Sequence, residues 1–248
     1  MDPYLDAIKE IKELATAEEI HRVDDISIYL ERFTDLDLIA TGIYAEVYEV
    51  PGEPDKVVKV CSSKIDGYYL FARWCMRPEN QDNPHVPTIH REDTIELSSG
   101  RVVRFYVIER LDDISDDGSE PTRPSHFHND DFGKLWGTLR TMTLPFADPK
   151  KPFNDQVQSA DEFVEQIQAP RPHFYMSSNE RKPVVIDDEV IDDHAALLKT
   201  LFDVLSFIDD HGVMDLHGGN YMLRGDTIVI TDPISHKYAK DAPLNLIK

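Results

Sequence analysis

The sequence contains few of the features that mark secreted or membrane proteins. Only two cysteines, Cys61 and Cys75, occur in 248 residues, too few for a disulfide framework and without the spacing of a metal site. No apolar run approaches the roughly 18 residues that a membrane span requires, and the N-terminal residues mix charge with helical periodicity, unlike a signal peptide. We therefore expect free thiols and a cytoplasmic protein that does not bind membranes.

Positive charge is also scarce. The 26 Lys and Arg residues are outnumbered by 47 Asp and Glu, which gives a formal net charge of -21 at pH 7. Binding a nucleic-acid backbone depends on clustered Lys and Arg, so direct nucleic-acid binding is not expected. The acidity favours a basic protein as partner. It could also mimic DNA and occupy a basic cleft on an enzyme, although a solvated surface that keeps the chain soluble is the simpler explanation.

Hydrophobic patterning predicts a β-rich first half that follows a helical N-terminus. Residues 1–33 have the spacing of two short helices, with apolar residues three apart from Leu5 to Leu14. Extended segments are predicted at 38–41, 45–50 and 56–61, then a helix at 65–76, then a hairpin from 94–97 and 102–111. This order amounts to five strands and one helix.

The second half has a different pattern. Residues 112–131 hold seven acids against Arg123 alone, which is typical of an exposed loop. Helical periodicity follows at 132–139 and 191–208, and a short hairpin is predicted around the turn Arg224-Gly225-Asp226. We predict an α+β fold with an N-terminal helical extension at 1–35, a β-rich lobe at 36–111, and a hinge, acidic loop and mostly helical lobe at 112–248.

The segment Asp215-Leu216-His217-Gly218-Gly219-Asn220 carries the strongest chemical signal, and Asp232 follows Asn220 by 12 residues. Phosphoryl transfer needs a carboxylate beside the attacking hydroxyl and oxygen ligands that hold Mg²⁺ across the phosphates. Protein kinases use an Asp and an Asn at this spacing, with a second Asp after the next hairpin. We therefore predict Asp215 as the catalytic base and Asn220 and Asp232 as metal ligands. A polar turn after a helix is the structural alternative.

The first half supplies candidate nucleotide contacts. Val57-Val58-Lys59-Val60 is typical of the strand whose Lys pairs with the α- and β-phosphates, and Lys59 lies 17 residues after Gly42. The segment that starts at Gly42 takes the place of a glycine-rich loop, although it has one glycine only. Glu109 falls where the hinge between lobes would contact adenine. Lys59 is predicted to be catalytic, and the predicted ATP-binding residues are Gly42, Tyr44, Ala45, Lys59, Glu109, Asn220 and Asp232.

With these motifs, the chain resembles the protein kinases, in particular the early serine/threonine protein kinases of T-seven-like lytic bacteriophages. The resemblance covers roughly residues 38–235, and its most specific parts are residues 214–220 and Ile230-Thr231-Asp232-Pro233-Ile234-Ser235. It implies a two-lobed protein-kinase-like fold with a β-rich N-lobe and a reduced α-rich C-lobe, with ATP and Mg²⁺ in the cleft. It also implies phosphorylation of host proteins in the bacterial cytoplasm, soon after infection, including basic nucleic-acid-processing enzymes, and host shut-off.

Several positions depart from cellular protein kinases. Val213 and Met214 replace the His and Arg that precede the catalytic Asp, and only sixteen residues follow Asp232. An activation segment ordered by phosphorylation is therefore not expected. The acidic partner of Lys59 is not identified, because Asp66 comes early and Glu79 lies beyond the predicted helix.

Two other functions stay open. His217 stands where aminoglycoside phosphotransferases also have His, which keeps a small-molecule substrate in consideration. The acidic surface also fits a binding protein that inhibits a basic host enzyme, with the kinase fold vestigial.

Overall fold

The computed structural model describes residues 3–16, 23–42, 45–62, 66–114, 135–139, 152–169, 171–174, 181–184 and 186–237. The chain has a mixed α and β fold and divides into two compact units. The first unit comprises Met1–Asp82 and Pro87–Leu111, and the second comprises Asn83–Val86 and Asp112–Lys248. None of the described helices is both long and apolar enough to cross a bilayer.

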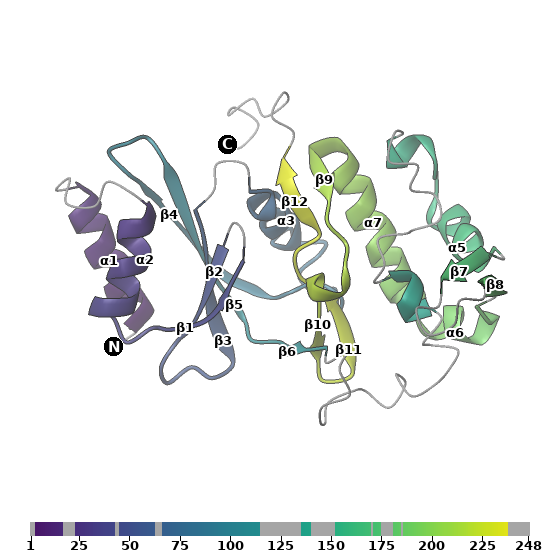
Figure 1. The fold of residues 1–248 in the computed structure, drawn as a ribbon, viewed down its shortest axis with the longest axis horizontal. Coiled ribbons are helices and arrows are strands. Elements are labelled where there is room, and N and C mark those ends of the chain that lie inside the picture. Colours follow the sequence, from purple (N-terminus) through teal and green to yellow (C-terminus); the bar gives the residue numbers. More distant parts are fainter. Residues whose placement is uncertain are drawn as a thin grey trace. The chain divides into compact units, whose positions relative to one another are not determined.

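A five-stranded antiparallel sheet with the order β1-β2-β3-β5-β4 forms the centre of the first unit (Figure 1). Its strands are β1 (Asp37–Thr41), β2 (Ala45–Glu49), β3 (Lys56–Cys61), β4 (Ile89–Glu96) and β5 (Val102–Glu109). The five predicted strands are confirmed, but β4 begins at Ile89 instead of residue 94. Its first half has no apolar alternation, since His90 and Arg91 are exposed, so the pattern did not predict it.

Helices cover both faces of this sheet. α1 (Pro3–Thr16) and α2 (Val23–Phe33) share one hydrophobic cluster with Val58, Val60 and Phe105 of the sheet. Because successive side chains of a strand point to opposite faces, Lys59 and Tyr106 lie on the other face, where α3 (Tyr68–Cys75) packs. The segment that the sequence set apart as an extension, residues 1–35, thus contributes α1 and α2 to the core of the first unit.

Helix α3 is shorter than predicted. The Asp66 carboxylate accepts the backbone N–H of Tyr68 at 2.8 Å, and this bond satisfies one of the free donors at the start of the helix. The described helix therefore begins at Tyr68 and not at residue 65.

The second unit contains helices α5 (Ala160–Gln168), α6 (Asp188–Asp193) and α7 (Ala195–His211), together with a helical turn at residues 135–139. The predicted long helix is confirmed in part, because it is divided at His194. That residue has φ -114° and ψ 15°, outside the helical range. The buried face of α7 includes Leu198, Leu201 and Leu205, as its periodicity predicted.

This unit also contains more strand than the mostly helical lobe that we predicted. The predicted hairpin is present as β10 (Tyr221–Arg224) and β11 (Thr227–Ile230), and β6 (Asp112–Asp113) adds a third strand. Two further pairs were not predicted: β9 (Gly212–Met214) with β12 (Ile234–Lys237), and β7 (Arg171–Phe174) with β8 (Arg181–Val184). These strands have only three or four residues each, too few for a clear period.

Four residues from the first half of the chain are built into the second unit. The Arg224 guanidinium donates to the carbonyl oxygens of Pro84 and Val86 at 2.9 and 3.0 Å. The backbone N–H of Ile230 donates to the carbonyl of His85 at 2.9 Å. Residues 83–86 thus line the hairpin β10–β11.

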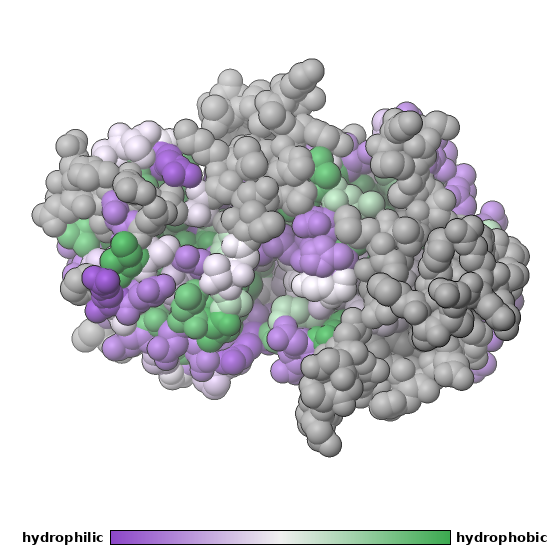
Figure 2. All heavy atoms as spheres, in the orientation of Figure 1, coloured by the Kyte–Doolittle hydropathy of each residue, from purple (hydrophilic) through white to green (hydrophobic). Residues whose placement is uncertain are grey.

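The surface carries both hydrophilic and hydrophobic side chains. On the face drawn in Figure 2, hydrophilic residues surround smaller hydrophobic areas. The large hydrophobic residues that are most exposed, among those described, are Leu5, Ile28, Leu38 and Ile39, all in the first unit.

Candidate functional site

Two adjacent loops of the second unit carry the predicted base, Asp215, and the predicted metal ligands, Asn220 and Asp232. The first, residues 215–220, connects β9 to β10, and the second, residues 231–233, connects β11 to β12. The backbone N–H of Asp215 donates to the carbonyl of Pro233 at 2.8 Å. The N–H of Thr231 donates to the carbonyl of Asn220 at 2.9 Å. Asp232, between these two contacts, is therefore held beside both ends of the first loop.

Asn220 is fixed by its side chain as well as by its backbone. It is 9% exposed and ends the 3-10 turn η3 (Gly218–Asn220). Its Nδ2 donates to the carbonyl oxygen of Asp215, and its N–H donates to the carbonyl of His217 at 2.9 Å. Because Nδ2 is the atom that makes this bond, Oδ1 is the atom of Asn220 that suits a cation.

His217 shapes the same loop. Its Nδ1 accepts the backbone N–H of Gly219 at 3.1 Å, which places the proton of the neutral ring on Nε2. Nε2 lies 3.9 Å from Oδ1 of Asp215. The side chains of His217 and Asp215 are 47% and 34% exposed, so the Asp215 carboxylate is open to a substrate.

The His217 ring packs so closely against Gly219 that the structure gives a reason for glycine at this position, which the sequence did not reveal. A Cβ at this position would lie 3.1 Å from Cε1 of His217 and 3.3 Å from its Nδ1. A side chain here would displace the ring, so the pair Gly219 and His217 acts as one unit. The Gly-Gly pair was the only signal in the sequence for so close an approach.

The oxygen ligands suit Mg²⁺ only together with a nucleotide. Mg²⁺ prefers hard oxygen ligands and is usually held by one or two carboxylates plus phosphates and water. Asp232 and Oδ1 of Asn220 match that description. No group of three His, Cys, Asp or Glu side chains that could hold a metal ion occurs within the described part of the chain. A magnesium ion held by these two residues would need its remaining ligands from phosphates and water.

Lys59 lies in the first unit, in the middle of β3. It pairs with Val47 and Tyr106 on the neighbouring strands and is 8% exposed. Its ammonium lies 3.6 Å from the centre of the Tyr68 ring.

Gly42 directly follows β1, and Ala45 begins β2. The N–H of Gly42 donates to the carbonyl of Ala45 at 2.7 Å. A Cβ on Gly42 would lie 3.5 Å from that carbonyl oxygen, an ordinary contact, so the described neighbours do not demand glycine. Tyr44, the third residue predicted for this loop, lies outside the described residues.

Glu109 ends β5, and its polar groups are engaged within the first unit. Its N–H donates to the carbonyl of Thr88 at 3.0 Å, and its Oε1 accepts the N–H of Thr88 at 2.6 Å. The N–H of Arg110 donates to the carbonyl of Asp55 at 2.7 Å. An adenine contact at Glu109 would therefore have to use groups other than these two N–H donors.

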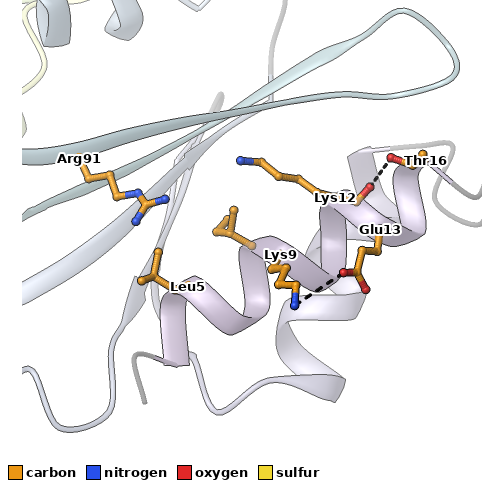
Figure 3. A pocket seen from close by; sticks show the side chains of 7 residues that line it. Leu5, Lys9, Lys12, Glu13, Thr16 and Arg91 are labelled. Atoms are coloured by element: carbon orange, nitrogen blue, oxygen red, sulfur yellow. Dashed lines mark hydrogen bonds and ion pairs between the residues drawn. The ribbon is translucent and has the colours of Figure 1, made fainter.

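An open cavity of about 650 Å³ lies in the first unit, and none of the predicted site residues lines it (Figure 3). It is lined by Leu5, Ile8, Lys9, Lys12, Glu13, Thr16 and Arg91. Lys12 and Arg91 bind the Asp93 carboxylate at 3.1 and 2.5 Å. The Lys12 pair thus holds α1 against β4, whereas Arg91 and Asp93 both belong to β4.

The structure brings Asp215, Asn220 and Asp232 together in the second unit, whereas Lys59, Gly42, Ala45 and Glu109 belong to the first. No protein-family model and no curated protein matches the sequence. The geometry of the two loops is therefore the ground for a functional proposal.

Proposed function

We propose that the chain is an ATP-dependent serine/threonine protein kinase of a bacteriophage that phosphorylates host proteins early in infection. The observation that carries this proposal is the pair of backbone hydrogen bonds, Asp215 to Pro233 and Thr231 to Asn220, that hold Asp232 beside the loop. A base and two oxygen ligands on adjacent loops are what phosphoryl transfer needs.

Asp215, Asn220 and Asp232 have different roles in the proposed reaction. Asp215, half-buried and open to solvent, orients the substrate hydroxyl and takes its proton as the oxygen attacks the γ-phosphorus. The bond from that phosphorus to the β,γ-bridging oxygen breaks, and ADP leaves. Asn220 and Asp232 would hold Mg²⁺, which neutralises phosphate charge when bound.

Lys59 would supply a fixed positive charge to the α- and β-phosphates. Its burial on β3 limits the motion of the side chain, which favours a defined position for the ammonium. Lys59→Ala is therefore expected to reduce the thermal stabilisation by ATP, because ligand binding to the native state stabilises it in proportion to affinity.

The test is transfer of label from γ-labelled ATP to proteins of a bacterial lysate, followed by identification of the labelled amino acids. The wild type is expected to label serine and threonine, and Asp215→Asn to lose at least about a hundredfold of the rate. Asp226→Asn, the same change in the exposed turn of the hairpin β10–β11, serves as the control. Equal labelling by wild type and Asp215→Asn would refute the proposal.

A small-molecule kinase is the second candidate, and the exposed His217 beside Asp215 favours it. The same assay with an aminoglycoside in place of the lysate separates the two. Phosphorylated aminoglycoside without phosphorylated protein would favour this candidate.

The third possibility, an acidic inhibitor of a basic host enzyme, draws on the charge of -21. Arrest of host growth that persists with Asp215→Asn would favour it, since an inhibitor that acts by binding has no need of a catalytic base.

A further inference from the structure

Helix α3, which covers the face of the sheet that carries Lys59, offers no carboxylate. Its eight residues, Tyr68–Cys75, read YYLFARWC and include neither Asp nor Glu. The group that α3 presents to Lys59 is instead the ring of Tyr68, whose centre lies 3.6 Å from Nζ. A cation at this distance from an aromatic face is attracted by the ring quadrupole.

The Tyr68 ring is itself held in place. The backbone N–H of Tyr68 donates to Oδ1 of Asp66 at 2.8 Å. The ring packs edge-on against Tyr106, with centroids 5.2 Å apart and planes at 73°, and against Phe71 at 6.2 Å. Tyr106 is the cross-strand partner of Lys59, so the same row of the sheet supports both the cation and the ring.

Burial strengthens this contact. Lys59 and Tyr68 are 8% and 1% exposed, and a cation–π contact is stronger when both groups are desolvated. The ring also adds no formal negative charge beside the ammonium, so this contact does not neutralise the charge that phosphates would bind.

The next residue along α3 makes a matching contact outside the candidate site. Arg104 of β5 lies over the ring of Tyr69, with its guanidinium carbon 4.6 Å from the centroid. Tyr68 and Tyr69 are both buried at the start of α3. A substitution of Tyr69 should therefore remove a similar amount of packing as one of Tyr68, and it should leave the contact between Tyr68 and Lys59 intact.

We propose that Tyr68 is a positioning residue for Lys59, and that the face of its ring holds the Lys59 ammonium in place. This inference rests on the proposed function, in that the ammonium so held binds ATP phosphates. Tyr68 does not touch the reacting atoms, and it acts through Lys59.

The contact itself is tested by NMR on lysine-labelled protein without nucleotide. The ε-CH₂ signal of Lys59, assigned as the signal missing in Lys59→Arg, is expected upfield of the other lysines because of the ring current. This displacement should persist in Tyr68→Phe and Tyr69→Leu and vanish in Tyr68→Leu. An undisplaced Lys59 signal in the wild type would overturn the contact without any variant, so the test does not depend on Tyr68→Leu folding.

The positioning role is tested by ATP affinity in the presence of Mg²⁺. Tyr68→Leu is expected to bind ATP about tenfold more weakly, with Tyr68→Phe recovering most of that loss. Tyr69→Leu should bind ATP as the wild type does. An unchanged affinity in a folded Tyr68→Leu, with the ring-current displacement lost, would overturn the positioning role. A wild type that binds no ATP would refute the proposed function and the positioning role together, while the NMR result would still decide the contact.

Discussion

Asn220 donates its side-chain N–H to the backbone carbonyl of Asp215, five residues earlier in the chain. This bond closes the loop on itself, and the backbone contact from Thr231 to Asn220 fastens the closed loop to the neighbouring one. Bonds within the protein thus fix the shape of the loop, which lowers the entropic cost of placing a base and metal ligands.

Asp232→Asn is expected to reduce metal-dependent ATP turnover by more than about a hundredfold, because the proposed ligand carboxylate is replaced by a neutral amide. The fold should persist, since Asp232 is held by the backbone of its neighbours. Steady-state turnover over a range of Mg²⁺ concentrations provides the measurement, with Asp226→Asn as the control. Turnover of Asp232→Asn at the wild-type level would remove this residue from the site.

Gly219→Ala is expected to cost about 1 kcal/mol of stability and to displace the His217 ring, because the new Cβ would meet Cε1 at 3.1 Å. Removing the ring should remove the conflict, so that His217→Ala tolerates the same change. Gly137→Ala serves as the control, since a Cβ there meets nothing within 4 Å. The measurement is thermal denaturation of Gly219→Ala, His217→Ala, Gly137→Ala and the double variant of Gly219 and His217. If Gly219→Ala lowers stability as much in the His217→Ala background as in the wild type, a clash with the His217 ring is not the cause.

Asp93→Asn is expected to destabilise the first unit by about 2 kcal/mol, because three donors lose a charged acceptor. The carboxylate is bound by Tyr4, Lys12 and Arg91, of which Tyr4 and Lys12 belong to α1. Burial alone would raise the pKa of Asp93, but hydrogen bonds from Arg91, Lys12 and Tyr4 hold the pKa below its usual 3.8. The contribution is therefore complete above that value and is lost as the pH falls through the lower folded-state pKa.

Urea unfolding and limited proteolysis of α1 provide the measurements for Asp93. Tyr4→Phe is the control, because it removes one neutral donor and leaves both ion pairs. If Asp93→Asn loses no more stability than Tyr4→Phe, the charge of Asp93 is not what anchors α1.

His85 is expected to make the second unit less stable in mild acid. Burial lowers its pKa from the ordinary 6.5, and nearby His194 and Arg224 lower it further, against the raising effect of the hydrogen bond to the Ile228 carbonyl. The neutral ring is favoured in the folded state. Its contribution is complete above about pH 6.5 and is lost as the pH falls through the folded-state pKa.

The comparison variant for His85 is His85→Asn, whose amide N–H can reach the same carbonyl but does not titrate in this range. Thermal unfolding from pH 7.5 to pH 5 should show a steeper decline for the wild type than for the variant. Parallel declines would assign the acid sensitivity to other groups.

The kinase activity that we propose is expected not to depend on phosphorylation of the protein itself. If the resemblance to protein kinases holds, Met214 replaces the Arg that reads the phosphate in cellular kinases. The chain after Asp232 pairs at once with β9 through Ile234 and Met214. The measurement is the initial rate on a basic protein substrate before and after phosphatase treatment, with dephosphorylation checked by mass spectrometry. A large loss of rate after dephosphorylation would show that a phosphate is needed.

The local sequence was enough to predict the elements whose hydrogen bonds join residues close together along the chain. The strands β2 and β3 are joined by a short turn, and the pair β10–β11 turns at Gly225, whose φ of 57° suits glycine. The core face of α7 followed from its helical period. In each case the partner of a residue lies within the same helix or hairpin, so the order of residue types alone predicts it.

Contacts between distant segments were decided by the tertiary structure. The pairing of β9 with β12 closes the two loops on each other, yet neither strand is long enough to show a period. The ring beside Lys59 and the bonds from α1 to Asp93 join residues whose types alone do not name a partner. The sequence by itself determined which side chains could act as base, ligands and phosphate-binding cation, because that chemistry belongs to residue type. Their placement was left to the tertiary structure, because hydrogen bonds and packing between remote segments depend on backbone geometry that no local pattern contains.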